Sequence, residues 1–348
     1  MKNDTPLDKI FKKIYENRQL YYASLELTFN CNFACRFCYN PVEREGQKRK
    51  NKISQNETPL AKEEIFKLLS DLRKAGVLYF TLTGGEPLVH PYFWEIAEKA
   101  KEHAFLLRIF TNGSLIDEKA AEKLGKIFPS CIEISIYGAS EECYEQSCGR
   151  GKLFPKVLKA LDLLKKEGFT VYLKCNLTKF TEKEMDKIQD LADSFGFPLN
   201  WDPILQVSDD GDDFPLKMSA SKESIERLFK EKKFKTGFSP FEGEERNTIC
   251  NIGRNLIHID PYGNIFPCIQ YREPIGNVKK DDISELFKNS KRLLELMKSA
   301  ENISKKMKDE NVFCRHCLGK SKLLYGDETV LDKTEIYLSN LKKKYNKV

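Results

Sequence analysis

This sequence lacks any long run of apolar residues. None approaches the roughly 18 residues that a helix needs to cross a bilayer, so we expect no membrane partner. The first residues are polar and lack a signal-peptide pattern, so we expect a cytoplasmic protein. Charge of one sign is not in large excess either, because 58 Lys and Arg stand against 52 Asp and Glu. The net charge of +6 therefore gives no reason to expect a nucleic-acid partner.

Histidine is scarce, with four residues, whereas cysteine is plentiful, with 11. In a chain without an export signal, so many cysteines indicate metal or thiol chemistry, because disulfides are uncommon in the cytosol. Seven of the cysteines fall into two sets, at positions 31, 35 and 38 and at positions 250, 268, 314 and 317. The histidines, at 90, 103, 258 and 316, are all remote in sequence from the first set.

Strand-like and helix-like segments alternate between residues 25 and 205. The expected strands are largely apolar and rich in β-branched and aromatic residues, at 25–29, 77–82, 105–110, 131–136, 170–175 and 199–204. We expect the helix that follows residue 58 to begin with Thr58 as N-cap and Pro59 in the first position. The alternation predicts an α/β fold with a parallel sheet, whose strands are covered on both faces.

Four distinctive short segments each follow one of the expected strands. They are the first cysteine set, the run 84–87, the run 111–113 and the pair 137–138. Because parallel strands place their carboxyl ends at one edge of the sheet, we expect these segments to converge on one rim.

Cys31, Cys35 and Cys38 form a CxxxCxxC pattern in a short loop. Three thiolates suit three corners of an iron–sulfur cube, with no fourth ligand nearby. The remaining iron would keep an open coordination position, which favours catalysis. A zinc site, which would need a fourth ligand, and accidental clustering remain alternatives.

With Phe37 directly before Cys38, this pattern resembles the CxxxCx(aromatic)C signature of the radical S-adenosylmethionine (SAM) superfamily. The resemblance covers roughly residues 23–205 and implies a partial (β/α)6 TIM-like barrel. It implies that the open iron of a [4Fe–4S] cluster chelates SAM. Reductive cleavage of SAM then gives a 5′-deoxyadenosyl radical that abstracts a substrate hydrogen, which is oxidoreductase-type chemistry. An electron donor such as flavodoxin or ferredoxin is also implied.

Gly84-Gly85-Glu86-Pro87 lies where this superfamily has its GGEP motif. Two glycines let the backbone approach a ligand and expose carbonyls to an ammonium group. Glu86 adds a negative charge. Without the preceding cysteines, the same run would more often be a turn.

The resemblance implies further cofactor-binding residues. It places Ser135 at the ribose of SAM and Arg150 at the methionine carboxylate, which a guanidinium suits. Asn112 is a further candidate, although it could equally be a turn residue. Phe37 and Tyr39, next to the third cysteine, complete the set of expected SAM contacts.

The late cysteines form a second pattern. A turn signal at 261–264 predicts a β-hairpin that brings Cys268 back beside the segment after Cys250. Cys314 and Cys317 add a CxxC. The set resembles the SPASM domain, and in the absence of cysteines beyond 317 it resembles the shortened twitch form with one auxiliary [4Fe–4S] cluster. A structural zinc site with four cysteines also fits the ligand count.

This reading divides the chain into an N-terminal helical extension (1–22), a radical SAM barrel (23–205) and a linker with a small α+β twitch-type domain (206–348). Cys143 and Cys148 follow the fourth expected strand, close to Arg150. A thiol there could donate a hydrogen atom to a substrate radical, as in some radical SAM epimerases, or could be inert.

The resemblance leaves three functions open. Modification of a peptide or protein, by a crosslink, a thioether or epimerisation, is favoured because SPASM and twitch enzymes often mature peptides. Fewer than thirty residues precede the first expected strand, so we expect no separate leader-binding domain there. The second function is small-molecule dehydrogenation or cofactor biosynthesis. The third is a non-catalytic iron–sulfur or zinc protein.

Overall fold

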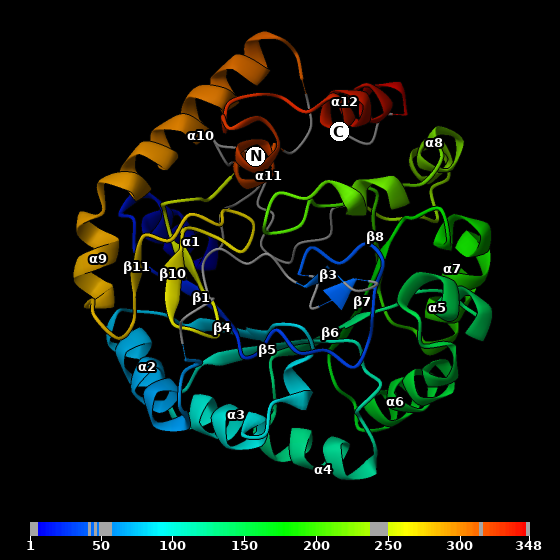
Figure 1. The fold of residues 1–348 in the computed structure, drawn as a ribbon, viewed down its shortest axis with the longest axis horizontal. Coiled ribbons are helices and arrows are strands. Elements are labelled where there is room, and N and C mark those ends of the chain that lie inside the picture. Colours follow the sequence, from blue (N-terminus) through cyan, green and yellow to red (C-terminus); the bar gives the residue numbers. More distant parts are fainter. Residues whose placement is uncertain are drawn as a thin grey trace.

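The computed structural model describes residues 6–40, 43–44, 47–48, 58–236, 250–312 and 316–345. Within these ranges one sheet has nine strands, in the order β11-β10-β9-β1-β4-β5-β6-β7-β8 (Figure 1). Its strands are β1 Tyr22–Glu26, β4 Tyr79–Thr83, β5 Leu106–Thr111, β6 Cys131–Ser135, β7 Val171–Asn176, β8 Leu199–Asp202, β9 Leu256–Ile259, β10 Asn264–Phe266 and β11 Gly276–Asn277. A separate pair is formed by β2 Glu43–Arg44 and β3 Gln47–Lys48.

The neighbouring pairs from β1 through β8 are all parallel. Helices α2 to α7 form a ring outside these strands (Figure 1). This arrangement confirms the predicted α/β fold with a parallel sheet. The helices are α1 Pro6–Glu16, α2 Lys62–Lys74, α3 Phe93–Glu102, α4 Glu118–Ile127, α5 Glu141–Cys148, α6 Phe154–Lys166, α7 Met185–Phe195, α8 Lys222–Lys230, α9 Ile283–Asn289, α10 Lys291–Asp309, α11 Leu318–Tyr325 and α12 Lys333–Lys344.

Two of the predicted boundaries are wrong. The first strand ends at Glu26, because the chain beyond it bonds the loop after β4, where Gly85 N donates to Thr28 O at 2.8 Å. Helix α2 has Ala61 as N-cap, and its Glu64 carboxylate accepts from the Ala61 amide at 2.8 Å. The expected start at residues 58 and 59 therefore lies before the helix.

The two faces of the parallel strands differ in chemistry. On the outer face, residues such as Leu25, Ile109 and Ile134 are buried against the helices. On the inner face, Arg108 of β5 and Glu133 of β6 form a buried ion pair. The parallel strands are therefore buried on both faces, but their inner face carries paired charged residues besides apolar ones.

The second part of the chain continues the same sheet. The predicted hairpin is present as β9 and β10, and Asp260 stabilises its turn by accepting from the Tyr262 and Asn264 amides at 2.9 Å. Strand β9 also runs parallel to β1, with Tyr22 opposite Leu256. The division at residue 206 stays a prediction.

Within the described part of the chain, no helix is both long enough and apolar enough to traverse a lipid bilayer.

Candidate functional site

The first cysteine set lies in the loop that follows the carboxyl end of β1. Cys31, Cys35 and Cys38 are all partly exposed. Burial, with the neighbouring Cys35, raises the pKa of Cys31 to about 12, and the same causes raise that of Cys38 further. Each thiol therefore lies within electrostatic reach of the next, and none is easily ionised on its own.

This donor set fits an iron–sulfur cube. Within the described ranges, no three His, Cys, Asp or Glu side chains are grouped closely enough to hold one metal ion. A cube binds each cysteine through a different iron, so its ligands need proximity without convergence on one point. Bound iron would also supply the positive charge that ionises these desolvated thiols.

The two glycines after β4 hold the start of the cysteine loop. Gly85 N donates to Thr28 O at 2.8 Å, and the next amide, of Glu86, donates to Asn30 O at 2.9 Å. A Cβ at Gly85 would meet Asn30 O at 2.3 Å, and a Cβ at Gly84 would meet Thr28 O at 2.3 Å. The glycines therefore permit contact between two loops of the chain itself, which the sequence did not suggest.

Glu86 lies beneath this contact and is fully buried. Its carboxylate accepts from Thr111 Oγ1 and the Asn112 amide at 2.8 Å, and from the Leu88 amide at 3.1 Å. Burial raises the pKa of Glu86 to about 7. Its side chain joins the ends of β4 and β5, so in this geometry it positions the rim.

Asn112 extends from the end of β5 to the cysteine loop. Its Nδ2 donates to Asn32 Oδ1 at 2.8 Å and lies 4.0 Å from Cys31 Sγ. Its Oδ1 accepts from Ser114 Oγ at 2.7 Å. The Asn112 amide therefore reaches the first cysteine of the set, and its predicted role in binding SAM stays a prediction.

Helix α5 supports the other side of the loop. The amides of Ala34 and Arg36 donate to the carbonyls of Cys148 and Ser147, at 2.9 and 3.0 Å. Arg150, just past this helix, is exposed and donates through Nε to Asn32 O at 2.8 Å. It therefore borders the loop.

Ser135 ends β6, is half-buried and pairs with Lys174 in register. The roles predicted for Arg150 and Ser135 in binding SAM stay predictions.

Cys143 and Cys148 are both buried in α5. The Cys148 thiol donates to Tyr144 O at 3.1 Å, and a hydrogen bond with it, together with burial, raises the pKa of Cys35. The Cys143 thiol donates to Tyr137 O at 3.3 Å. A role of either thiol as hydrogen-atom donor stays a prediction.

The aromatic residues around Cys38 point in different directions. The Phe37 ring lies 6.1 Å from the Tyr137 ring, on the side of β6. Tyr39 turns toward β1, where its hydroxyl donates to Glu26 Oε1 at 3.5 Å. Contact of either ring with SAM stays a prediction.

The late cysteines also come together. Burial, with the charges of neighbouring cysteines, raises the pKa of Cys268 and Cys317 to about 12 and that of Cys250 to about 11. Cys317 caps α11 by accepting the Lys320 amide at 3.4 Å. Cys314 lies outside the described residues. Three thiols from separate segments, in mutual electrostatic reach, fit a second cluster.

His316, between the last two cysteines of the sequence, is buried. Its Nδ1 lies 2.8 Å from Glu335 Oε2, and its Nε2 lies 2.7 Å from Glu328 O. Glu335 also accepts the Cys317 amide at 3.1 Å. Sequence reasoning missed this support, because Glu335 comes from α12 and shares no local pattern with the CxxC.

A second missed group is the charged residue Glu26 in the first strand. It is fully buried and contacts Arg272 and His258. A signal was present, because Glu26 interrupts an otherwise apolar run between Leu25 and Leu27. A charge in such a run needs a partner.

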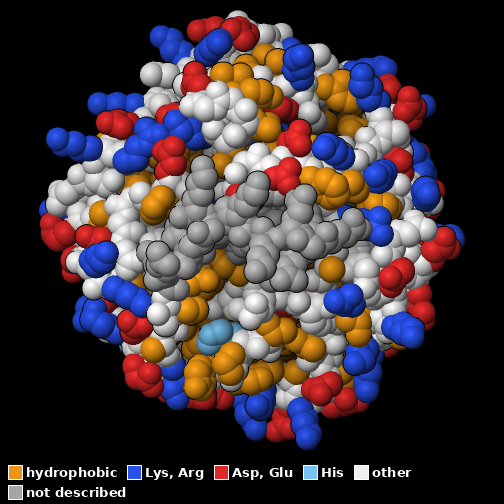
Figure 2. Space-filling model, viewed as in Figure 1, with side chains coloured by type: hydrophobic (Ala, Val, Ile, Leu, Met, Phe, Trp, Pro, Cys, Tyr) orange, Lys and Arg blue, Asp and Glu red, His pale blue; other side chains and the backbone are white. Residues whose placement is uncertain are grey.

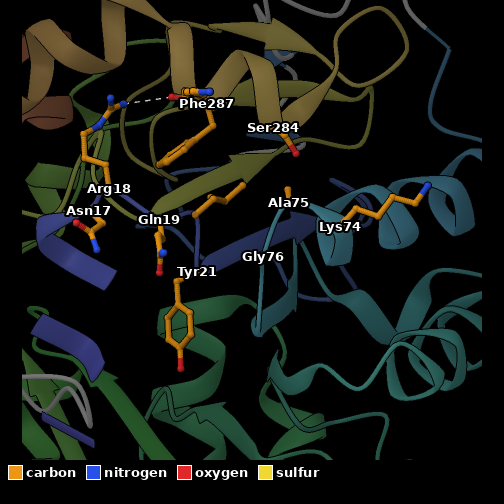
Figure 3. Close-up of a pocket in the computed structure, with 11 residues that line it drawn as sticks. Asn17, Arg18, Gln19, Tyr21, Lys74, Ala75, Gly76, Ser284 and Phe287 are labelled. Carbon is orange, nitrogen blue, oxygen red and sulfur yellow. Dashed lines mark hydrogen bonds between the residues drawn. The ribbon is translucent and has the colours of Figure 1, made fainter. Parts of the chain in front are cut away.

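The molecular surface has two notable features. In the view of Figure 2, hydrophobic side chains gather below the centre of the face, and side chains of both charges occupy its periphery. A pocket of about 500 Å³ lies at the opposite, amino-terminal ends of β1 and β4 (Figure 3). There Arg18 donates to Phe287 O at 3.2 Å, and Lys74 and Tyr21 also line the pocket. This pocket is separate from the cysteine loop.

Comparison with known families identifies two regions. Residues 25–195 match the family model of the radical SAM superfamily. Residues 250–318 match the family model of an iron–sulfur cluster-binding domain named SPASM. These matches contain both cysteine sets and agree with the resemblances found in the sequence.

Several curated proteins are similar over most of the chain. The mycofactocin maturase MftC of Mycobacterium tuberculosis is 27% identical over 78% of this chain and 71% of its own. The antilisterial bacteriocin subtilosin biosynthesis protein AlbA of Bacillus subtilis is 27% identical over 86% of this chain and 66% of its own. An AdoMet-dependent heme synthase of Methanosarcina barkeri is 24% identical over 76% of this chain and 81% of its own.

Solved structures share the fold. Streptococcus suis SuiB bound to its precursor peptide SuiA superposes with a TM-score of 0.67 and 14% identity, over 96% of this chain and 82% of SuiB. anSMEcpe with bound AdoMet gives a TM-score of 0.68 and 17% identity, over 94% of this chain and all (100%) of the other.

Proposed function

Because this chain belongs to the radical SAM superfamily and carries a SPASM iron–sulfur cluster-binding domain, we propose that it modifies a peptide or protein by radical chemistry. The modification would be a crosslink, a thioether or an epimerisation. One observation carries the proposal: the three-cysteine loop is held at the rim by β4, β5 and α5 together, with its thiols in mutual reach.

This arrangement supports the following assignment of residues to the cofactors. Cys31, Cys35 and Cys38 would bind the first cluster, and SAM would occupy its open iron. When bound, this cluster and SAM supply a 5′-deoxyadenosyl radical that takes a hydrogen atom from the substrate. The auxiliary cluster would be held by the set at 250, 268, 314 and 317.

The protein's own contribution is position and shielding. Carbonyls of Gly84 and Gly85 would receive the ammonium of SAM, Arg150 its carboxylate and Ser135 its ribose. The enclosed inner face of the sheet, with the Arg108–Glu133 pair, would receive the substrate and keep water away from a reactive centre.

A peptide substrate is supported by the relatives. AlbA is named for the biosynthesis of a bacteriocin, and SuiB has been solved with a precursor peptide. The similarity to an AdoMet-dependent heme synthase favours a second candidate, a small-molecule step in cofactor biosynthesis. We infer that a flavodoxin or ferredoxin supplies electrons, and that the reduced thiols require a reducing compartment such as the cytoplasm.

Anaerobic reconstitution followed by iron and sulfide counting tests the cofactor assignment. We expect about eight irons per chain, from two cubes of four. The triple variant Cys31→Ala/Cys35→Ala/Cys38→Ala should keep about half of them. Cys131→Ala, which removes a buried cysteine outside both sets, should keep all of them.

SAM cleavage tests the enzymatic function. The reduced, reconstituted chain should form 5′-deoxyadenosine, and the triple variant should not. Failure of the loaded wild type to form it would leave the non-catalytic iron–sulfur function. A short precursor-peptide gene beside this gene, and mass changes in that peptide on incubation, would select the peptide over the small-molecule substrate.

A further inference from the structure

A buried ion pair lies between the two cysteine sets. Arg272 Nη1 lies 3.0 Å from Glu26 Oε2, and Arg272 Nη2 lies 3.1 Å from Glu26 Oε1. The Glu26 side chain is fully buried and the Arg272 side chain is 4% exposed. This two-point geometry fixes the orientation of both groups, and it is stronger than a single contact.

The pair is supported from β9. His258 Nε2 lies 3.0 Å from Glu26 Oε2, and His258 Nδ1 lies 2.7 Å from Ser24 Oγ. Burial, with the nearby Arg272 charge, lowers the pKa of His258, although Glu26 opposes that shift. Burial alone would raise the pKa of Glu26, but Arg272 and His258 hold it well below its usual range. Glu26 and Arg272 are therefore the charged partners.

One side of the pair reaches the first cysteine loop. Tyr39, directly after Cys38, donates to Glu26 Oε1 at 3.5 Å, and the Arg272 guanidinium lies 5.9 Å from its ring centre. Asp209 N donates to Tyr39 O at 2.9 Å, and Asp209 Oδ2 lies 4.0 Å from Arg272 Nη2. The Asp209 carboxylate is also close enough to Cys38 to contribute to its raised pKa.

The other side reaches the auxiliary set. Arg272 follows the turn in which Tyr271 N donates to Cys268 O at 3.3 Å. Burial raises the pKa of Cys268, and the Arg272 charge opposes that rise. A cation thus lies beside an auxiliary ligand, and an anion lies beside a ligand of the first set.

A buried ion pair contributes little net stability compared with apolar residues of the same volume, but it imposes one geometry. Here the partners are 246 residues apart in sequence and belong to segments that carry different cysteine sets. Specific placement of these segments is therefore the effect that this pair can supply.

We propose that Glu26 and Arg272 are positioning residues that lock the two cluster loops together, and that the Arg272 cation favours reduction of the auxiliary cluster. Asp209 acts in the opposite sense on the first cluster. The inference rests on the cluster assignments of the proposed function, and it adds a link between the two centres. The charge near a cluster is one of the factors that set its potential.

The test is a redox titration of both clusters in the reconstituted full chain, with dithionite as reductant and electron paramagnetic resonance as readout. In Arg272→Met, the reduced-to-oxidised ratio of the auxiliary cluster at a fixed potential should fall about tenfold, a shift of about 59 mV for one electron. Arg272→Lys, which keeps the charge, should restore most of that ratio. Asp209→Asn should raise the reduced-to-oxidised ratio of the first cluster at a fixed potential.

The matched control is Arg108→Met, which removes another buried arginine from an ion pair, inside the barrel. It should leave both potentials unchanged. An equal shift in Arg272→Met and Arg272→Lys, or no shift in either, would overturn the proposal.

If Arg272→Met fails to load iron, Glu26→Gln carries the test. It removes the anion of the pair, so both clusters should become easier to reduce, and unchanged potentials overturn the proposal. A wild type that holds fewer than two clusters would instead refute the proposed function. If the wild type holds two clusters and cleaves SAM, but the variants leave both cluster potentials unchanged, only this inference is refuted.

Discussion

Replacing Gly85 by alanine tests whether the glycines after β4 exist to let two loops touch. A Cβ at this position would lie 2.3 Å from Asn30 O and 2.6 Å from Phe29 O, both backbone atoms. Because ordinary contact begins at 3.4 Å, the loops must separate by about 1 Å. Gly85, unlike Gly84, does not have a positive φ, so the effect reports the contact and not backbone strain.

The expected magnitude has two parts. Overpacking of this kind costs about 1–3 kcal/mol. Separation also weakens the bonds from Gly85 N to Thr28 O and from Glu86 N to Asn30 O, each of which contributes about 1 kcal/mol. We therefore expect a loss of about 3 kcal/mol, a factor of about 100 in the folding equilibrium.

Urea unfolding of the metal-free chain measures the loss of stability. Iron counting after reconstitution measures the effect on cluster binding. Gly85→Ala should lower the unfolding midpoint, and it should keep about four of about eight irons, because the displaced loop carries the first ligand set. The matched control is Gly125→Ala in α4, where no heavy atom lies within 4 Å of the added Cβ. This control should raise the free energy of unfolding by up to about 1 kcal/mol. A Gly85→Ala chain with a wild-type midpoint and full iron would refute the loop-contact argument.

Three further predictions concern buried groups. Burial raises the pKa of Glu86 from 4.5 to about 7. The free energy of unfolding of the wild type should therefore fall by about 3 kcal/mol relative to Glu86→Gln as the pH rises through that window. Urea unfolding at each pH measures this difference, and a difference that does not change with pH would contradict the prediction. Burial lowers the pKa of His316, but Glu335, the Glu328 carbonyl and Asp332 together raise it above its usual value, so the pair with Glu335 stabilises the fold at low pH and the effect fades as the pH rises. Glu335→Gln should therefore lower the free energy of unfolding by about 1–3 kcal/mol at pH 6 and by less at pH 8. Thermal unfolding measures both losses, and equal losses at the two pH values would contradict the stabilising role of the pair. In an epimerisation, Cys143→Ala or Cys148→Ala should stop solvent deuterium from entering the product, with buried Cys175→Ala as control; undiminished turnover in both variants would remove the thiol-donor role.

Local patterns predicted the elements well but not their limits. The alternation of strand-like and helix-like segments predicted α2, whose Ile65 and Leu72 are buried. The start of this helix was misplaced, because Leu60 N bonds Pro261 O. The first strand was shifted because Leu27 continues its apolar pattern into the loop. In both cases a contact with a distant segment sets the boundary of the element, and the spacing of residues in the sequence does not reveal such contacts.

The site divides in the same way. Cysteine spacing and the GGEP run predicted two cysteine sets and one rim, since those features are local in sequence. The partners that support them are not local: Arg272 lies opposite Glu26 and Glu335 opposite His316. Only the fold brings these charges together, although a buried charge in an apolar strand is itself a sign that a partner exists.

The pairing of β1 with β9 affects how this chain is made. Tyr22 finds its partner Leu256 only after the residues between them have been synthesised, which takes on the order of ten to fifty seconds at the ribosome. During that interval the backbone groups along one side of the earliest strand have no neighbour, and an exposed edge of this kind recruits strands from other chains. A nascent chain shortened before residue 256 would keep that edge open, and would be expected to aggregate even with its barrel helices in place.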